Sequence, residues 1–479
     1  MTLLTDLYEI TMANGYLENG KEREIAYFDM FFRTLPDGGG FAIMAGLEQL
    51  IAYIENLRFT EQDIAYLRGL EMFSEPFLEY LKRFRFTGDI WAVPEGTPIF
   101  PGEPIVTVRA PLMEAQFIET MLLLTINHQS LIATKANRIV RAAGGRSVVE
   151  FGSRRAQGYD AAVHGARAAF IGGCTGTACV LAGSKMGIPV SGTMAHSWIQ
   201  TFDSELEAFR QYARLYPEDC TLLVDTYSVL SSGIPNAIRA FNEELVPRGC
   251  RPKGVRIDSG DITYLSKKAR RMLDEAGFPD CKIVASNSLD ENIIRDILIQ
   301  GAKVDIFGVG ERLITAASAP VFDGVYKLAA LEKGGEVIPK IKLSENTTKI
   351  TTPGHKCLWR LFDRESGKAI ADVITLAGEQ IDDSKPFELF DPDHTWKRKT
   401  VGNFVARRLL RPVFQNGACV YRQPKLSEIK DYCARQVRTL WEEVLRFENP
   451  HRYYVDLSDA LWRERQKLLD IYTVKKERS

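Results

Sequence analysis

The chain has 479 residues, 45% of them hydrophobic and 26% charged, a balance typical of globular proteins with a sizeable core and not of disordered chains. Its 61 basic and 62 acidic residues give a net charge of −1, which does not favour a nucleic-acid or membrane-surface protein but leaves room for local phosphate pockets. No uncharged apolar run reaches about 18 residues, and the N-terminus lacks a basic segment followed by an apolar one. We therefore expect neither a membrane span nor a signal peptide.

The first 20 residues predict a helix, with Thr5 as its N-cap. The stretch "GYLENGKE" that follows nearly matches the spacing of a phosphate-binding P-loop. However, Glu22 stands where a Ser or Thr would hold magnesium, and a helix precedes the stretch instead of a strand. We interpret it as a helix end, with Gly20 closing the helix and Lys21 facing its carbonyls.

Residues 85–110 alternate short β-type runs with Pro and Gly turns, which predicts a small antiparallel sheet, and 112–143 predict a helix. Seven short apolar runs then recur every 20–35 residues or so, the period of one βα unit in a barrel, with helical segments between them. The runs begin near residues 147, 168, 189, 221, 254, 282 and 304. This pattern favours an α/β barrel, and a doubly wound open sheet remains the second choice.

The predicted organisation has three parts. Residues 1–125 form the N-terminal part of an α/β sandwich, and 126–330 form the barrel with the active site. Residues 331–479 begin β-like and end in helices, and we expect them to pack back on the N-terminal part. Eight scattered cysteines form no C-x-x-C pair, which favours free thiols in a reducing, cytoplasmic setting.

Polar or glycine residues end most of the seven runs. Because the carboxyl ends of parallel strands line one mouth, these residues should converge there. The set is Arg154, His196, Asp225, Asp258, Asn287 and Gly308.

Each of these residues also has a purely structural interpretation. Arg154 either clamps an anion in a two-pronged contact or is a solvated arginine. Asp225 and Asp258 suit sugar hydroxyls, a magnesium ion or a developing cation, whereas we expect Asp261 to cap the next helix. For His196, spacing alone favours a histidine that only hydrogen-bonds to the backbone.

The stretches "ASNSLDE" and "FGVGERL" end the last two runs in small residues. Barrels often bind phosphate at these loops through backbone amides, although glycines in ordinary loops would look the same.

Taken together, the motifs resemble the nicotinate phosphoribosyltransferase family closely. They are "TDLYEITMANGY", "EFGSRRAQG", "GTMAHSW", "DTYS", "GVRIDSGD", "ASNSLDE" and "FGVGERL", in the family's order. The resemblance implies the type II phosphoribosyltransferase fold, an irregular α/β barrel joined to an α/β sandwich. It also implies a head-to-tail homodimer with active sites at the interface.

The implied reaction belongs to NAD biosynthesis. Nicotinate and phosphoribosyl pyrophosphate would give nicotinate mononucleotide and pyrophosphate, and the coupled hydrolysis of ATP to ADP and phosphate would make the enzyme a ligase. His196 would be the phosphorylated histidine, since an imidazole nitrogen is a competent nucleophile.

The resemblance also implies roles for residues at matching positions. Phe151 and the partner protomer's copy of Tyr8 would sandwich the pyridine ring. Arg154 and Arg256 would lie around the nicotinate carboxylate and the pyrophosphate, and Asp225 and Asp258 near the ribose and magnesium. The 5′-phosphate cradle would be Ser286, Asn287, Gly308 and Gly310, and cross-subunit basic residues for pyrophosphate or ATP would be Arg33, Lys327 and Lys342.

The choice between acid and amide rests on one loop. A nicotinamide-using relative has an Asp after the second barrel strand, whereas "FIGGCTGTAC" has no acid here, which favours a carboxylate substrate. The alternatives are a nicotinamide or quinolinate phosphoribosyltransferase and a non-catalytic barrel that binds phosphometabolites.

Overall fold

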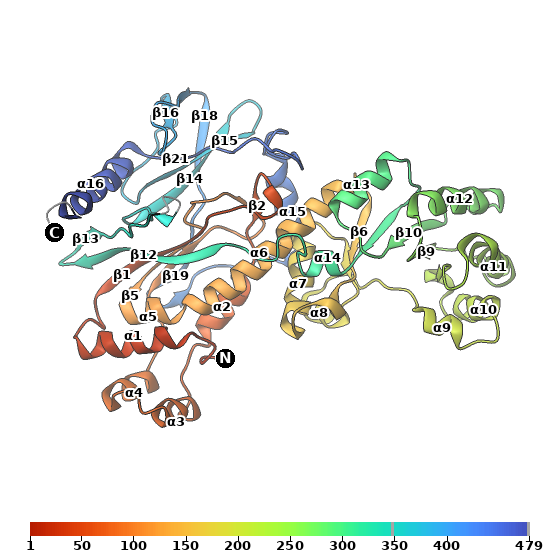
Figure 1. Ribbon diagram of the computed structural model, residues 1–479, viewed down its shortest axis with the longest axis horizontal. Coiled ribbons are helices and arrows are strands. Elements are labelled where there is room, and N and C mark those ends of the chain that lie inside the picture. Colours follow the sequence, from red (N-terminus) through yellow and green to blue (C-terminus); the bar gives the residue numbers. More distant parts are fainter. Residues whose placement is uncertain (346–348, 477–479) are drawn as a thin grey trace. The chain divides into compact units, whose positions relative to one another are not determined.

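The chain forms two compact units, seen in a computed structural model that describes residues 1–345 and 349–476 (Figure 1). Unit 1 combines Met1–Leu131 with Val321–Ser479, and unit 2 is Ile132–Pro320. The boundaries placed from the sequence, at 125/126 and 330/331, lie six residues before the first and ten residues after the second of these. The second one moves because strand β12 pairs with β1 and therefore belongs to unit 1.

Unit 1 is built on a seven-stranded antiparallel sheet. Its central strand β1 is buried along most of its length and pairs with β12 on one side and β5 on the other. In spatial order the strands are β13 (Glu336–Pro339), β12 (Gly324–Lys333), β1 (Ile25–Phe32), β5 (Val106–Pro111), β3 (Asp89–Ala92), β19 (Arg411–Gln415) and β20 (Ala418–Cys419). Segments from both ends of the chain therefore share one sheet.

A second sheet of unit 1 comes from the C-terminal segment. Its strands, in spatial order, are β18 (Phe404–Arg408), β14 (Lys356–Asp363), β15 (Ala369–Leu376) and β21 (Val455–Leu457). A buried ion pair joins the two sheets, because Lys356 Nζ of β14 lies 2.7 Å from Asp29 Oδ2 of β1. Two small strand pairs complete the unit: β2 (Ala42–Ile43) with β4 (Pro98–Ile99), and β16 (Phe387–Phe390) with β17 (Arg398–Val401).

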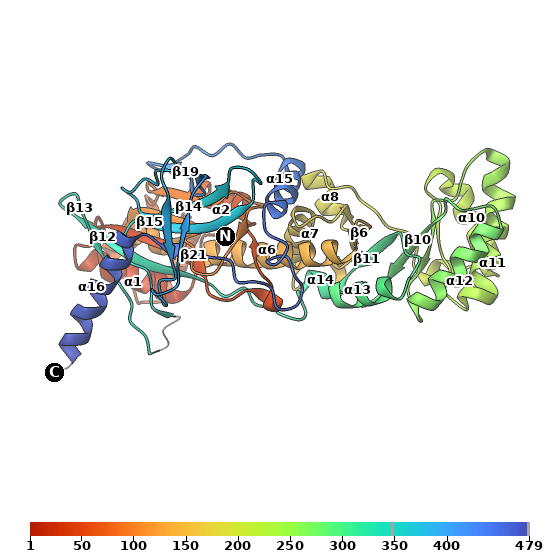
Figure 2. The same ribbon diagram turned by 90° about the horizontal axis from the view of Figure 1, so that it is seen from above.

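Helices cover the sheets of unit 1, and the last one carries the C-terminal end of the chain (Figure 2). They are α1 (Leu7–Glu18), α2 (Leu47–Glu55), α3 (Glu61–Gly69), α4 (Glu75–Lys82), α5 (Leu112–Phe117), α15 (Leu426–Arg438) and α16 (Asp459–Lys476). The long helix α6 (Glu119–Ala142) contains the first boundary between the units. None of the described helices is both long and apolar enough to cross a bilayer.

Unit 2 is a parallel sheet whose first strand pairs with its last. The spatial order is β7 (Gly176–Thr177), β6 (Ser147–Glu150), β11 (Ile306–Val309), β10 (Lys282–Ser286), β9 (Gly254–Ile257) and β8 (Thr221–Leu223). Pairing of β6 with β11 is expected of a barrel, since a doubly wound open sheet does not bring its first and last strands together.

The barrel has one seam. Val190 continues the ring as an isolated bridge to Thr177 of β7, but within the described residues the end strands β7 and β8 do not pair with each other. Side chains cross this seam instead. Arg256 of β9 donates to Thr193 Oγ1 at 2.7 Å, and the ring of His196 contacts the hydroxyl of Thr226, which follows β8.

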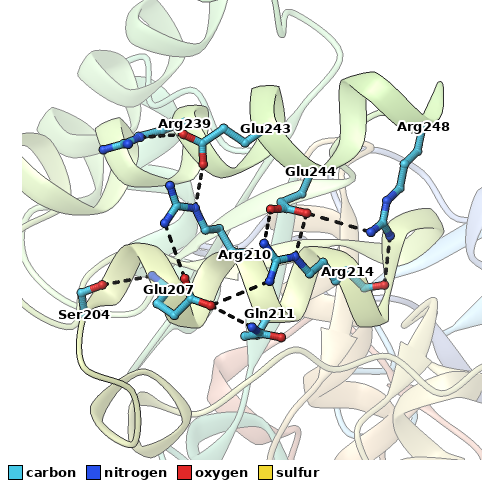
Figure 3. Close-up of polar contacts among 9 residues, drawn as sticks. All are labelled: Ser204, Glu207, Arg210, Gln211, Arg214, Arg239, Glu243, Glu244 and Arg248. Atoms are coloured by element: carbon cyan, nitrogen blue, oxygen red, sulfur yellow. Dashed lines mark hydrogen bonds and ion pairs between the residues drawn. The ribbon is translucent and has the colours of Figure 1, made fainter.

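Helices flank the barrel strands, and α10, α11 and α12 lie beyond β10 in both views (Figures 1 and 2). In chain order the helices are α7 (Tyr159–Ile171), α8 (Val180–Met186), α9 (His196–Gln200), α10 (Glu205–Leu215), α11 (Ile234–Ala240), α12 (Ile262–Glu275), α13 (Glu291–Ile299) and α14 (Glu311–Ile314). A network of arginine–glutamate pairs covers α10 (Figure 3). Its central pairs join Arg210 to Glu243 and Arg214 to Glu244, both at 2.6 Å.

Three local predictions were wrong. The run at 189 forms only the isolated bridge of Val190 to Thr177 and not a strand. The run at 168–174 is not a strand, because α7 extends to Ile171 and β7 is only Gly176–Thr177; a short apolar run fits a buried helix as well as a strand. Thr5 does not cap the first helix, which begins at Leu7 after Asp6; its hydroxyl donates to Glu9 at 2.5 Å instead.

Candidate active site

The carboxyl ends of the barrel strands carry a connected group of polar side chains. His196 starts the short helix α9 directly after the seam, and its side chain is 41% exposed. Its Nδ1 lies 3.1 Å from Thr226 Oγ1, and its Nε2 lies 3.9 Å from Asp258 Oδ2. Both ring nitrogens therefore face oxygen atoms from neighbouring strand ends, and the ring stays accessible.

Asp225 follows β8 and Asp258 follows β9, and the carboxylate of Asp225 contacts the backbone of Asp258. Asp225 Oδ2 accepts hydrogen bonds from the Asp258 N–H at 3.2 Å and the Ser259 hydroxyl at 2.5 Å. Asp258 Oδ1 accepts from the Ser286 hydroxyl at the end of β10 and lies 3.5 Å from an Arg256 guanidinium nitrogen. One network thus joins three neighbouring strand ends.

Phe151 and Arg256 form the aromatic side of the mouth. The Arg256 guanidinium lies 6.0 Å from the centroid of the Phe151 ring, within reach of a cation–π contact. The ring packs over Gly308 of β11, where a Cβ atom would stand 2.6 Å from two ring atoms. Gly308 is therefore needed for the close approach of Phe151 and not for an unusual backbone angle.

Glu150 is fully buried at the end of β6, immediately before Phe151. Its carboxylate accepts hydrogen bonds from the Gly152 N–H and from the Thr177 hydroxyl, the latter at 2.6 Å. Burial raises the pKa of this carboxyl, and the two hydrogen bonds oppose that shift. One side chain thus contacts both the turn after β6 and the strand β7.

The loops after β10 and β11 have the irregular backbone expected of a tight cradle. Asn287 and Ser288 have φ angles of 88° and 49°, in the left-handed region that side chains usually avoid. Ser288 Oγ donates to Glu311 Oε1 at 3.1 Å, which joins this loop to the start of α14 directly after Gly310.

Arg154 stands apart from the polar network. It lies in a short 3-10 turn after Phe151 and is exposed. Asp261 takes the predicted capping role, since its Oδ1 accepts from the Tyr264 N–H at 2.8 Å.

The remaining predicted residues lie in unit 1. Tyr8 on α1 is 45% exposed, and desolvation together with Glu119 raises the pKa of its hydroxyl. Lys327 of β12 has its Nζ 3.7 Å from Glu119 Oε1, so Tyr8 and Lys327 share one carboxylate. Glu119 also accepts from Gln116 Nε2 at 2.6 Å.

Arg33 and Lys327 line a cavity of about 690 Å³ in unit 1. Arg33 lies 3.6 Å from Asp323 and has a buried Nε with no hydrogen-bond partner among the described residues. Lys342 does not line this cavity; its backbone N–H donates to Thr351 Oγ1 at 2.9 Å.

The mouth offers little for a metal held by protein alone. Among residues 1–345 and 349–476, no three or more His, Cys, Asp or Glu side chains are grouped as metal ligands. Asp225 Oδ1, however, is buried and makes no hydrogen bond to any described residue. One such oxygen fits Mg²⁺, which usually takes one or two carboxylates along with substrate phosphates. Asp258 fits less well, because Ser286 and Arg256 already occupy its Oδ1 side.

No role was assigned from the sequence to Glu150, Thr193, Thr226 or Glu119, and Ser259 was considered only as a possible helix cap. Thr226 and Ser259 directly follow the two strand-end aspartates, so their positions were a usable signal. Glu150 was visible as an acid ending an apolar run, but its partner Thr177 lies on a strand that the sequence placed wrongly.

Comparison with known proteins gives a single family along the chain. Profiles of the nicotinate phosphoribosyltransferase N-terminal domain, the family itself and its C-terminal domain match residues 3–127, 146–356 and 355–465. A nicotinate phosphoribosyltransferase of Bacillus subtilis is 46% identical over 99% of this chain and 96% of its own length.

Two solved structures share the architecture. Human nicotinic acid phosphoribosyltransferase matches with a TM-score of 0.84 and 30% identity, over 98% of this chain and all of the human one. A nicotinate-nucleotide pyrophosphorylase from Pyrococcus furiosus matches with a TM-score of 0.70 and 26% identity, over 91% of this chain and 94% of its own. These matches confirm the predicted fold class of an α/β barrel with an α/β sandwich.

Proposed function

The chain belongs to the nicotinate phosphoribosyltransferase family, and we propose that it transfers the phosphoribosyl group of phosphoribosyl pyrophosphate to nicotinate in NAD salvage. The observation that carries this proposal is the similarity to the Bacillus subtilis enzyme over 99% of the chain. The polar mouth of unit 2 supports it, since a phosphoribosyl transfer needs an aromatic platform, cations for anionic substrates and carboxylates near the sugar.

Phe151 and Arg256 would hold the nicotinate. The Phe151 ring offers a flat face for stacking, and the adjacent guanidinium suits the substrate carboxylate. No acid occurs between Cys174 and Cys179, which supports nicotinate over nicotinamide because an acid there would repel a carboxylate. Arg154, exposed beside Phe151, would contact the pyrophosphate.

The transfer itself would proceed through a cationic sugar. The bond between C1 and the pyrophosphate oxygen breaks with its electron pair leaving on pyrophosphate, and the ring nitrogen of nicotinate attacks C1 from the other face. Asp225 and Asp258 would stabilise the positive charge on the sugar, and positioning of the two reactants would supply much of the rate. Bound Mg²⁺, held in part by Asp225 Oδ1, would neutralise charge on the leaving pyrophosphate.

Backbone amides at the ends of β10 and β11 would hold the 5′-phosphate. The residues concerned are Ser286, Asn287, Gly308 and Gly310. Ser286 and Gly308 lie at the ends of β10 and β11, and Asn287 and Gly310 follow them; phosphate sites are common at the last strands of α/β barrels.

His196 would accept a phosphoryl group from ATP. A proton on Nε2 would face Asp258, which leaves Nδ1 unprotonated and accepting from the Thr226 hydroxyl. Nδ1 would then attack the γ-phosphorus of ATP while the bond to ADP breaks, and water would later release phosphate from the histidine. The exposure of the ring is consistent with access by a nucleotide.

A shared-site homodimer would bring unit 1 residues to the partner's barrel. Tyr8 would stack on the second face of the pyridine, and Arg33, Lys327 and Lys342 would contact pyrophosphate or ATP. The exposure of Tyr8 supports this role, since an aromatic ring on a surface helix is available to another protomer. Eight free cysteines support a reducing, cytoplasmic setting.

The test compares wild-type protein with His196→Ala. In the wild type, nicotinate and phosphoribosyl pyrophosphate should stimulate ATP hydrolysis, and the variant should lose this stimulation while retaining a slow transfer that does not depend on ATP. His394→Ala is the matched control, because His394 is also exposed and paired with an aspartate but lies in unit 1. Wild-type coupling of ATP hydrolysis to product in His196→Ala would refute the phosphohistidine. Turnover of nicotinamide or quinolinate in place of nicotinate would refute the substrate assignment.

A further inference from the structure

We propose that Glu150 is a positioning residue for the pyridine site, which it serves by tying the turn that carries Phe151 to strand β7. The proposal rests on the proposed function, because it assumes that nicotinate stacks on Phe151. Glu150 itself is fully buried and touches no substrate.

The tie consists of two hydrogen bonds from opposite sides of one carboxylate. Oε1 accepts from the Gly152 N–H in the turn, and Oε2 accepts from the Thr177 hydroxyl in β7. Thr177 Oγ1 in turn accepts from the Cys179 N–H at 2.9 Å, so the connection continues into the loop after β7. This loop is the one whose lack of an acid favours nicotinate over its amide.

The turn has little freedom to move in other directions. A Cβ atom on Gly152 would stand 2.6 Å from Ile314 Cβ and 2.7 Å from the Gly310 carbonyl oxygen, so the turn packs directly on α14 and the loop before it. The Phe151 N–H also donates to the Val309 carbonyl at 2.8 Å. On the side of β7, the Ala178 N–H donates to the Glu150 carbonyl oxygen at 2.8 Å, and the Glu150 carboxylate adds the contact that reaches the turn itself.

A carboxylate is chemically suited to this place. Both neighbours are donors, and an ionised carboxyl accepts from both without presenting a hydrogen to either. Burying such a group without a cation is unfavourable, and an apolar side chain of similar volume would avoid that cost. The buried acid is therefore explained by what it holds in place and not by core stability.

The experiment uses the full-length protein and the variant Glu150→Gln, which keeps the shape but replaces one accepting oxygen by an NH₂ group. Either the Gly152 N–H then loses its acceptor, or the Thr177 hydroxyl must turn from donating to accepting. We expect the KM for nicotinate to rise about tenfold, a loss of about 1.4 kcal/mol, with kcat and the KM for phosphoribosyl pyrophosphate within about twofold of wild type. Glu205→Gln is the matched control. Glu205 is a buried glutamate of unit 2 that accepts from Ser232 and Asn236, and its substitution should lower Tm without changing the KM for nicotinate.

Several outcomes would overturn the proposal. One is an unchanged KM for nicotinate in folded Glu150→Gln, and another is an equal rise for both substrates. A similar rise in Glu205→Gln would also overturn it. If Glu150→Gln does not fold, Thr177→Val removes one of the two donors and should raise the KM for nicotinate about threefold; no change there would equally refute the tie.

Hydrogen exchange separates this proposal from the proposed function. In Glu150→Ala, amides of 151–156 and 177–180 should exchange faster together, whereas Glu205→Gln should leave them unchanged. Unchanged exchange in Glu150→Ala would refute the tie even in an active enzyme. Faster exchange combined with no nicotinate turnover by the wild type would support the tie and refute the proposed function.

Discussion

Gly308→Ala tests the placement of Phe151 with a single methyl group. Gly308 has no positive φ, so alanine can adopt its backbone conformation, and only space opposes the substitution. The added Cβ would stand 2.6 Å from two atoms of the Phe151 ring. Carbon atoms pack at about 3.5–4.0 Å, so the ring must move by about 1 Å.

The size of the effect follows from this displacement. A misplacement of about 1 Å at a reacting centre can lower the rate about 100-fold, which corresponds to about 2.7 kcal/mol of transition-state stabilisation. We therefore expect kcat/KM for nicotinate to fall 10- to 100-fold, roughly, with overpacking lowering the free energy of unfolding by about 1–3 kcal/mol. Steady-state kinetics with varied nicotinate and a thermal melt measure the two quantities.

Two other glycines serve as controls for Gly308→Ala. Gly254→Ala also crowds a barrel strand, since its Cβ would lie 2.8 Å from the Lys282 carbonyl oxygen, but it does not face Phe151. Gly69→Ala lies on α3 with no atom within 4 Å of the new Cβ and should behave as wild type. Wild-type kcat/KM in Gly308→Ala would contradict this placement of Phe151, as would an equal loss of kcat/KM in Gly254→Ala at the same Tm.

Two further predictions concern other parts of the chain. Tyr8→Ala should raise the KM for nicotinate although Tyr8 lies in unit 1. Tyr8→Phe, which keeps the ring and loses the contact with Glu119, should raise this KM less. An unchanged KM for nicotinate in Tyr8→Ala would contradict the proposed shared-site dimer. Glu243→Gln should lower Tm slightly at neutral pH and low salt. Arg210 and Arg239 lower the pKa of Glu243 from its ordinary 4.5 to about 2, so its stabilisation is present above pH 4.5 and is lost as the pH falls towards 2. The difference in Tm between wild type and Glu243→Gln should therefore vanish over that range, and a constant difference would contradict the ion pairing.

The strands with strong local patterns were predictable from the sequence. The apolar runs near 221, 254, 282 and 304 correspond to β8, β9, β10 and β11. Each of them was recognisable as a short apolar run that ends in a polar or glycine residue. The prediction for the run at 168 failed because residues 165–171 of α7 are buried without a break, and a short continuous apolar run carries no periodicity that distinguishes a helix from a strand.

Contacts between distant segments could not be predicted in the same way. The pairing of β1 with β12 joins residues about 300 positions apart, and no local pattern specifies such a partner. The contacts of His196 with Thr226 and of Glu150 with Thr177 depend in the same way on the order of strands around the barrel. The sequence indicated which residues end the strands but not which of them touch.

The seam between β7 and β8 has a mechanical consequence. A barrel whose neighbouring strands are all joined by backbone hydrogen bonds resists deformation equally around its circumference. A barrel with one gap in this pairing concentrates strain at the gap. The segment before His196 is held there by the Arg256 and Thr226 side chains, which can exchange partners without breaking the barrel's backbone pairing. His196, the proposed site of phosphorylation, thus stands at the most compliant point of an otherwise stiff ring.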